Sequence, residues 1–118
     1  YIRKVYSLEQ INFETFLKVE MRVGEIIRAE MFEEAIKPAI KLWIEFGDDI
    51  GVKKSSAQIT DNYSPKQLIG KKVIAVVNLR PRQIASFISE VLILGALSPT
   101  GITLLKIEEN VQVGERIH

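Results

Sequence analysis

The clearest alternation of apolar and polar side chains along the chain runs over residues 40–46. Successive side chains of a β-strand point to opposite faces, so this segment is predicted to be a strand with one apolar and one mixed face. Gly24 lies inside another apolar run, and a glycine inside a strand marks a bulge or a sharp bend. The complete set of further predicted strands is 19–27, 52–60, 72–79, 91–97, 102–107 and 111–117.

Two short helices interrupt this strand pattern. The run Ser-Pro-Lys-Gln at 64–67 combines an N-cap serine, a proline at the first helical position and a glutamine that can reach back to the cap. Gly70 then ends this helix. Near the N-terminus, Ser7 to Gln10 fits a capping box, and the helix behind it is predicted to end near Lys18. Its apolar stripe consists of Ile11, Phe13, Phe16 and Leu17.

The order of these elements is typical of a small all-β barrel. The OB-fold, a five-stranded Greek-key barrel, has this layout: three strands, a short helix that closes one end, and further strands. Other small barrels and sandwiches fit the pattern of many short strands as well. A length of 118 residues predicts one domain, 1–118, in which residues 1–18 carry the N-terminal helix.

The side-chain inventory excludes most catalytic and metal chemistry. The chain has no cysteine, and its one histidine is the last residue, His118. Nucleophilic triads and most zinc sites need more than this, and the glycines match neither phosphate-loop motif. We therefore expect no catalytic residue, no metal and no cofactor. Because cysteine and long apolar runs are both missing, we also expect a cytoplasmic protein without membrane insertion.

Charge is distributed unevenly along the chain, although the net charge is only +1. Residues 51–82 hold seven Lys or Arg and one acidic residue, Asp61, so this segment carries +6. A segment of this kind can attract polyanions whatever the total charge of the protein. The alternative interpretation is a solvated face with no ligand.

Three features near this segment are candidates for ligand contact. Arg80 and Arg82 flank Pro81, and their planar guanidinium groups suit phosphate and carboxylate, unless they belong to a plain surface turn. Trp43 lies on the mixed face of its strand. It can stack on a base, contact an apolar peptide side chain, or cover the core edge or a subunit interface. Phe87 either caps the barrel or lines a groove.

Several long runs of residues, in order and correctly spaced, carry a family resemblance. They are 21–26, 37–47, 54–60, 63–65, 68–71, 76–85, 89–92 and 114–117. Over about residues 13–117 the chain resembles the CsaA family, export chaperones built from a tRNA-binding domain. That domain also occurs as a stand-alone bacterial tRNA-binding protein and in methionyl-tRNA synthetases.

The resemblance implies an OB-fold homodimer that binds and does not catalyse, with the N-terminal helix at the dimer interface. The implied ligand is precursor or unfolded polypeptide, and tRNA on the same basic face is the alternative. Ser86 stands where the family has glycine, and Val91-Leu92 replaces the Gly-Met of tRNA-binding members, which makes the rim more apolar. The expected contacts are Lys41, Arg80 and Arg82 for charge, Trp43 and Phe87 for apolar surface, and Ser56, Gln58, Asn78 and Ser89 for hydrogen bonds.

Overall fold

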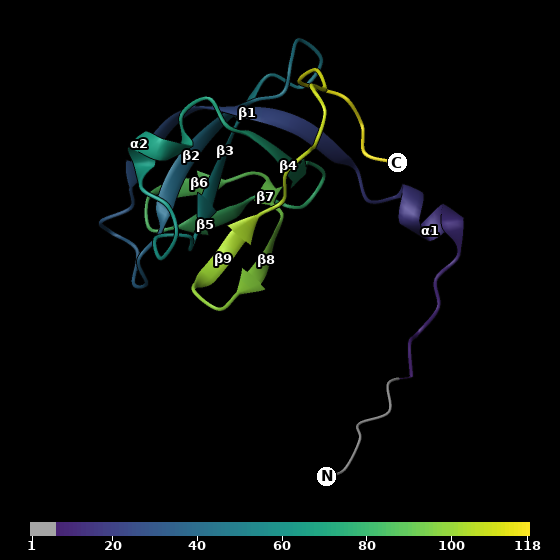
Figure 1. Cartoon of the computed structure of the whole chain (residues 1–118), viewed down its shortest axis with the longest axis horizontal. Helices are drawn as coiled ribbons and strands as arrows, with labels where there is room; N and C mark the ends of the chain where they lie inside the picture. Colours follow the sequence, from purple (N-terminus) through teal and green to yellow (C-terminus); the bar gives the residue numbers. More distant parts are fainter. Residues whose placement is uncertain (1–6) are drawn as a thin grey trace.

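Figure 1 shows the computed structural model, in which residues 7–118 are described. Five antiparallel strands, in the order β3-β2-β1-β4-β7, curl into a nearly closed barrel. The all-β OB-fold predicted from the sequence is confirmed. The barrel strands are β1 (Met21–Met31), β2 (Ile40–Glu45), β3 (Val52–Ala57), β4 (Lys72–Val76) and β7 (Leu92–Ile93).

Hydrogen bonds between β3 and the residues just before β7 close most of the barrel. The Lys54 carbonyl accepts from the Val91 N–H at 3.2 Å. The hydroxyl of Ser55, which is almost fully buried, donates to the Val91 carbonyl at 2.8 Å. We call this contact between residues 54–56 and 89–91 the seam.

The apolar face predicted for β2 fills the barrel interior. Ile40, Leu42 and Ile44 are fully buried and form the centre of the main core cluster. Leu68, at the end of helix α2 (Pro65–Leu68), is also fully buried and closes the barrel at one end. The core therefore sits inside the barrel, and the outward faces of β2 and β3 are left for other contacts.

Gly24 of β1 is required by packing. A Cβ atom at this position would lie 2.5 Å from Ile44 Cγ2 and 2.6 Å from Phe46 Cε1, closer than any real contact. The irregularity in the pairing of β1 with β2 lies further along, between Ile26 and Arg28. Gly24 itself is therefore not the site of the expected bulge. Two core side chains pack closely against its bare backbone, and the register shift between Ile26 and Arg28 comes after it.

Of the two predicted helices, one begins at the predicted cap and the other begins later than predicted. At α2 the predicted cap is confirmed, because the Gln67 side chain accepts from the Ser64 N–H at 2.9 Å. Helix α1 (Phe13–Leu17) is shorter than predicted, and its cap is Asn12, whose Oδ1 accepts from the Thr15 N–H at 2.8 Å. The predicted start at Ser7 is wrong, because Asn12 offers a strong cap directly before the aromatic residues. Residues 1–6 of the predicted N-terminal region lie outside the described residues.

The C-terminal prediction is also wrong. Residues 111–117 form no regular strand. They make one isolated β-bridge to β1, between Arg116 and Arg22. Gly114 adopts a φ of +95°, and a Cβ there would lie 2.7 Å from the Phe46 carbonyl oxygen. This turn breaks the ladder, so the segment runs beside β1 as an irregular extension.

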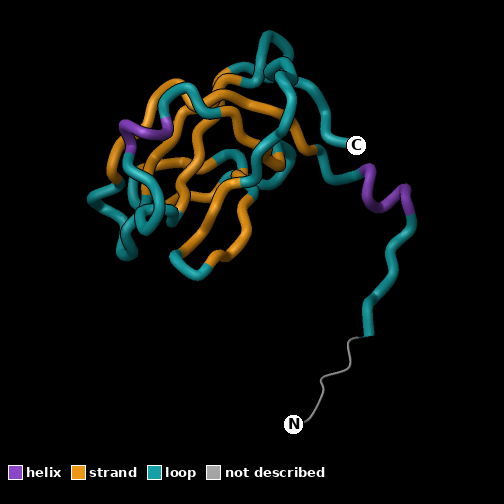
Figure 2. The backbone as a smooth tube through the Cα atoms, viewed as in Figure 1, coloured by secondary structure: helices purple, strands orange, loops and turns teal. Residues whose placement is uncertain are grey.

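Two small hairpins follow β4 along the chain. The first, β5 (Arg82–Ile84) and β6 (Phe87–Ser89), was expected to be an arginine loop. The second, β8 (Gly95–Ser98) and β9 (Gly101–Leu104), pairs the end of the strand predicted at 91–97 with the start of the one predicted at 102–107, and the first part of 91–97 forms β7 separately. Figure 2 shows β8 and β9 projecting from the barrel, and α1 lying to one side of it, joined to β1 by a short loop.

Candidate binding groove along the seam

A groove with two connected parts follows the outside of the seam. The first part, of about 220 Å³, lies beside Arg80 and Arg82. The second, of about 350 Å³, lies between the end of β3 and β7. Ser56 and Leu92 line both parts, so the two form one surface, which we call the seam groove.

Five residues predicted as contacts line this groove. Ser56, Arg80, Arg82 and Ser89 lie in its first part, and Gln58 lies in its second part. Both arginines and Gln58 are exposed. The two serines also support the wall, because the Ser56 N–H donates to Ser89 Oγ at 3.2 Å. The Ser89 hydroxyl hydrogen has no acceptor among the described residues and is available to a ligand.

The β5–β6 hairpin sets the direction of the Arg82 side chain. Arg82 pairs with Ser89, and Ile84 pairs with Phe87. Residues directly opposite each other share a face of the hairpin, and so do alternate residues along each strand. Arg82, Ile84, Phe87 and Ser89 therefore lie on one face, which joins the groove to the outer surface of the barrel.

An aromatic cluster of Phe32, Trp43 and Phe87 supports that hairpin face. The ring centroids of Phe87 lie 5.5 Å from Phe32 and 5.7 Å from Trp43, both edge to face. Phe87 is only 7% exposed and belongs to a second, small core cluster. Of the two roles open from the sequence, Phe87 therefore caps the barrel wall, and it does not line the seam groove.

Cationic side chains cover this aromatic cluster. The guanidinium carbon of Arg28 lies 4.2 Å from the centre of the Trp43 ring, and Lys54 Nζ lies 5.2 Å from the centre of the Phe87 ring. Lys41 Nζ is 3.3 Å from a Glu34 carboxylate oxygen. A nucleic-acid base can stack on this face of Trp43 only after Arg28 moves away.

Asn78 has a different position from the one expected. Its Oδ1 accepts from the Glu20 N–H at 3.0 Å, and its Nδ2 donates to the Lys18 carbonyl at 2.6 Å. These bonds hold the chain between α1 and β1 against the end of β4. Asn78 is therefore a clamp for the α1 segment and is not part of the groove lining.

The groove contains a charged residue, Glu90, that was not expected from the sequence. Glu90 lines the first part, and its carboxylate accepts from the Lys54 N–H at 3.0 Å, so a negative charge lies beside the arginines. Leu92, which the resemblance places on a more apolar rim, is half exposed and lines both parts. The apolar run containing Leu92 was visible in the sequence, but its exposure depends on β7 being an end strand of the sheet.

Residues 7–118 contain neither a cluster of metal-ligand side chains nor a candidate membrane-spanning helix. No group of three or more His, Cys, Asp or Glu side chains comes together there to hold a metal ion. None of the helices in this part of the chain is both long and apolar enough to cross a bilayer.

Comparison with known proteins agrees with the barrel and its family. The family described as "Putative tRNA binding domain" matches residues 21–116. A methionine–tRNA ligase from Caldanaerobacter subterraneus is 35% identical over 97% of this chain, and the match spans 17% of the ligase. The chain thus corresponds to about a sixth of the length of such a relative.

Solved structures add a second line of similarity. A CsaA chaperone protein from Picrophilus torridus is 53% identical, with a TM-score of 0.87 over 92% of this chain and all of that one. A chaperone CsaA from Bacillus anthracis is 44% identical, with a TM-score of 0.86 over 93% of this chain and all of that one. The resemblance to CsaA is confirmed. The chain therefore belongs to the tRNA-binding domain family and, within it, resembles the CsaA chaperones.

Proposed function

We propose that this chain is a polypeptide-binding chaperone module that holds an extended segment of unfolded or precursor protein in the seam groove. The observation that carries this proposal is the make-up of the groove, in which apolar, cationic and anionic side chains lie close together. Leu79, Ile84 and Leu92 supply apolar surface, and Arg80 and Arg82 supply positive charge. Unfolded polypeptide offers the same mixture of groups.

Free strand edges support the same ligand. β3 and β7 are the two end strands of the sheet, and the seam bonds reach only as far as Ser56 and Ser89. Beyond that point Ala57 and Leu92 line the second part of the groove without a mutual hydrogen bond in the described residues. An extended peptide can bind such an edge through its backbone and place alternate side chains in the groove.

Charge argues for polypeptide over a polyanion in the groove itself. The carboxylate of Glu90 lies in the same part of the groove as Arg80 and Arg82. It repels a phosphate backbone, whereas a peptide can meet it with a lysine, an arginine or a backbone N–H. The cover that Arg28 forms over Trp43 removes a ready platform for base stacking.

The direct test is a charge placed in the apolar wall of the groove. Leu92→Asp is expected to weaken binding of reduced, carboxymethylated α-lactalbumin by about tenfold or more, because burying a leucine contributes roughly 1.5–3 kcal/mol. Leu97→Asp is the matched control, since Leu97 is 82% exposed on β8 and lies outside the groove. Fluorescence anisotropy reports both affinities. Equal losses for the two variants would place the polypeptide elsewhere.

A homodimer is part of this proposal. No residue of α1 is buried, and Phe13 is 71% and Ile11 65% exposed. The end of α1 is nevertheless fixed to the barrel, because the Arg116 side chain donates to the Leu17 carbonyl at 2.8 Å. A fixed helix with exposed aromatic and aliphatic side chains is suited to cover by a second copy of the chain.

Binding of tRNA is the second candidate, and the family match over residues 21–116 favours it. The +6 segment at 51–82 places Arg80 and Arg82 on the rim. In this case the logarithm of the affinity falls steeply with the logarithm of the salt concentration. Arg82→Ala should reduce the magnitude of this slope by roughly 0.7–0.9, the contribution of one phosphate contact. An unchanged slope would remove Arg82 from any tRNA interface.

A further inference from the structure

A second cleft, of about 300 Å³, shares no lining residue with the seam groove. It lies between the loop that follows α2 and the chain that leaves β9. We call it the lysine cleft. The residues that matter for its chemistry are Tyr63, Lys71, Leu104, Lys106, Ile107 and Glu109.

Hydrogen bonds fix both sides of this cleft. On one side, the Lys71 N–H donates to the Leu68 carbonyl at 3.0 Å, and the Lys71 carbonyl accepts from the Ile26 N–H at 2.9 Å. On the other side, the Leu104 N–H donates to the Tyr63 hydroxyl oxygen at 3.0 Å. The cleft is therefore formed before any ligand arrives.

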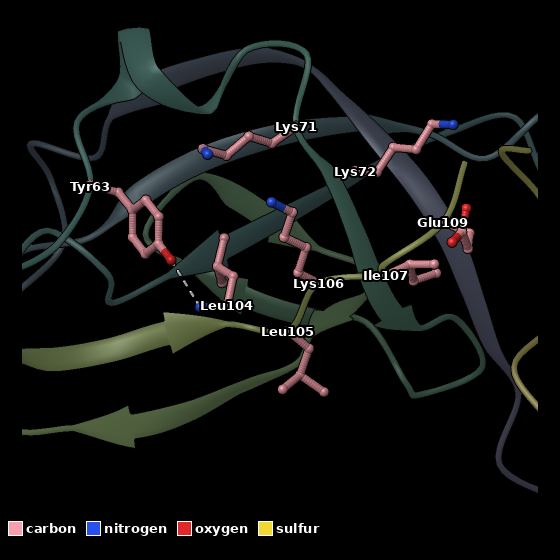
Figure 3. Close-up of a pocket in the computed structure, with 8 residues that line it drawn as sticks. All are labelled: Tyr63, Lys71, Lys72, Leu104, Leu105, Lys106, Ile107 and Glu109. Atoms are coloured by element: carbon pink, nitrogen blue, oxygen red, sulfur yellow. Dashed lines mark hydrogen bonds between the residues drawn. The ribbon is translucent and has the colours of Figure 1, made fainter. Parts of the chain in front are cut away.

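Two ammonium groups in the cleft have no counterion among the described residues. Figure 3 shows the side chains of Lys71 and Lys106 extending into the space beside the Tyr63 ring. Neither lysine makes an ion pair within residues 7–118. Lys72 is different, because its Nζ is turned away and donates to the Val111 carbonyl at 2.6 Å. Two neighbouring unpaired cations favour an anion placed between them.

Tyr63 adds a directed donor to this pair. Its hydroxyl oxygen accepts from the backbone of β9, so its own hydrogen remains to donate to a ligand. Leu104 and Ile107 continue from this point as an apolar wall. The cleft thus has a cationic end with three donor groups, two ammonium groups and one hydroxyl, and an apolar body, the usual make-up of a small-molecule site.

We propose that the lysine cleft binds a small organic carboxylate with an apolar chain. The carboxylate contacts the ammonium groups of Lys71 and Lys106 and the Tyr63 hydroxyl, and the chain lies along Leu104. A singly charged group is favoured over a phosphate dianion, because the apolar wall removes water from the anion and the cost of desolvation grows with charge. Glu109 at the far side disfavours a polyanion.

The same chemistry can come from a free fatty acid or from the C-terminus of a peptide, and the probes distinguish these. Octanoate, N-acetyl-leucyl-leucine and its C-terminal amide are titrated into the ¹⁵N-labelled full chain and followed by amide chemical shifts. Saturable shifts centred on Leu104 and Lys71 are expected for a carboxylate probe and not for the amide. The tighter of the two carboxylates identifies the source.

Charge-neutral variants of similar length complete the test. Lys71→Met and Lys106→Met are each expected to weaken the carboxylate probe by about tenfold, the effect of losing one charged hydrogen bond. Lys66→Met is the matched control, since Lys66 is exposed on α2 outside the cleft and its loss leaves binding unchanged.

Three results would overturn the proposal. They are shifts that appear away from the cleft, an inorganic phosphate titration as tight as octanoate, and unchanged binding in both cleft variants. A failure of this proposal can be distinguished from a failure of the proposed polypeptide binding in the seam groove. Leu92→Asp leaves octanoate binding intact, and Lys71→Met leaves unfolded-polypeptide binding intact, because the two sites share no residue.

Discussion

Replacing Ser55 by alanine perturbs the seam at its most buried polar contact. The Ser55 side chain is 1% exposed, and its hydroxyl donates to the Val91 carbonyl at 2.8 Å. Alanine leaves that carbonyl without this donor in a site where Val91 itself is 5% exposed. Leaving a buried acceptor unsatisfied costs about 1–3 kcal/mol, so the free energy of unfolding should fall by that amount.

Ser56 provides the control for this experiment, because it is the next residue on the same strand. Its backbone N–H makes the seam bond to Ser89, and its hydroxyl makes no hydrogen bond among the described residues. Ser56→Ala should therefore change stability by less than about 0.5 kcal/mol. Urea unfolding at one fixed protein concentration measures both variants, since a dimer's stability depends on concentration. Equal stabilities of the two variants would refute this account of the seam.

Three further changes test other parts of the molecule. Gly24→Ala places a methyl group 2.5 Å from Ile44 Cγ2 and should cost about 1–3 kcal/mol in urea unfolding, whereas wild-type stability would contradict the packing described. Phe13→Ser should shift sedimentation toward monomer, and an unchanged dimer would remove α1 from the interface. Asn78→Ala removes the clamp on the α1 segment, so it should weaken the proposed homodimer while leaving polypeptide affinity per chain unchanged.

Local patterns predicted the parts of the fold that local chemistry determines. The strand over 40–46 follows from a strict alternation, and its apolar face is the face that is buried. The cap of α2 follows from Ser64 and Gln67, which are three residues apart. The C-terminal segment failed because its turn depends on a distant contact, that of Gly114 with the Phe46 carbonyl.

The candidate site shows the same division. Arg80 and Arg82 reach the groove as expected, because the chain after the buried strand emerges at the seam. The β5–β6 hairpin was missed because Arg-Pro-Arg is typical of a loop, and Ala85 makes the turn with a φ of +53° that glycine would normally adopt. The cover of Trp43 by Arg28 depends on the register of β1 with β2, which no local pattern encodes.

Near-zero net charge was the least informative global property. The positive segment at 51–82 does reach the groove rim, but Glu90 lies beside it and changes the chemistry of the site. Glu90 comes from a segment whose overall charge is negative. The seam brings Glu90 next to β3, although the two are far apart in the sequence. The charges that lie together in the groove therefore depend on this long-range contact.

The central claim is tested most directly by comparing unfolded polypeptide with unfractionated tRNA at about 0.1 M and about 0.5 M NaCl. Screening weakens interactions between exposed charges over this range, whereas apolar burial persists. We predict that affinity for carboxymethylated α-lactalbumin changes by less than about threefold between the two salt concentrations and falls by about tenfold or more in Leu92→Asp. Tight tRNA binding with a steep salt slope, together with polypeptide binding that is weak or insensitive to Leu92→Asp, would contradict the account.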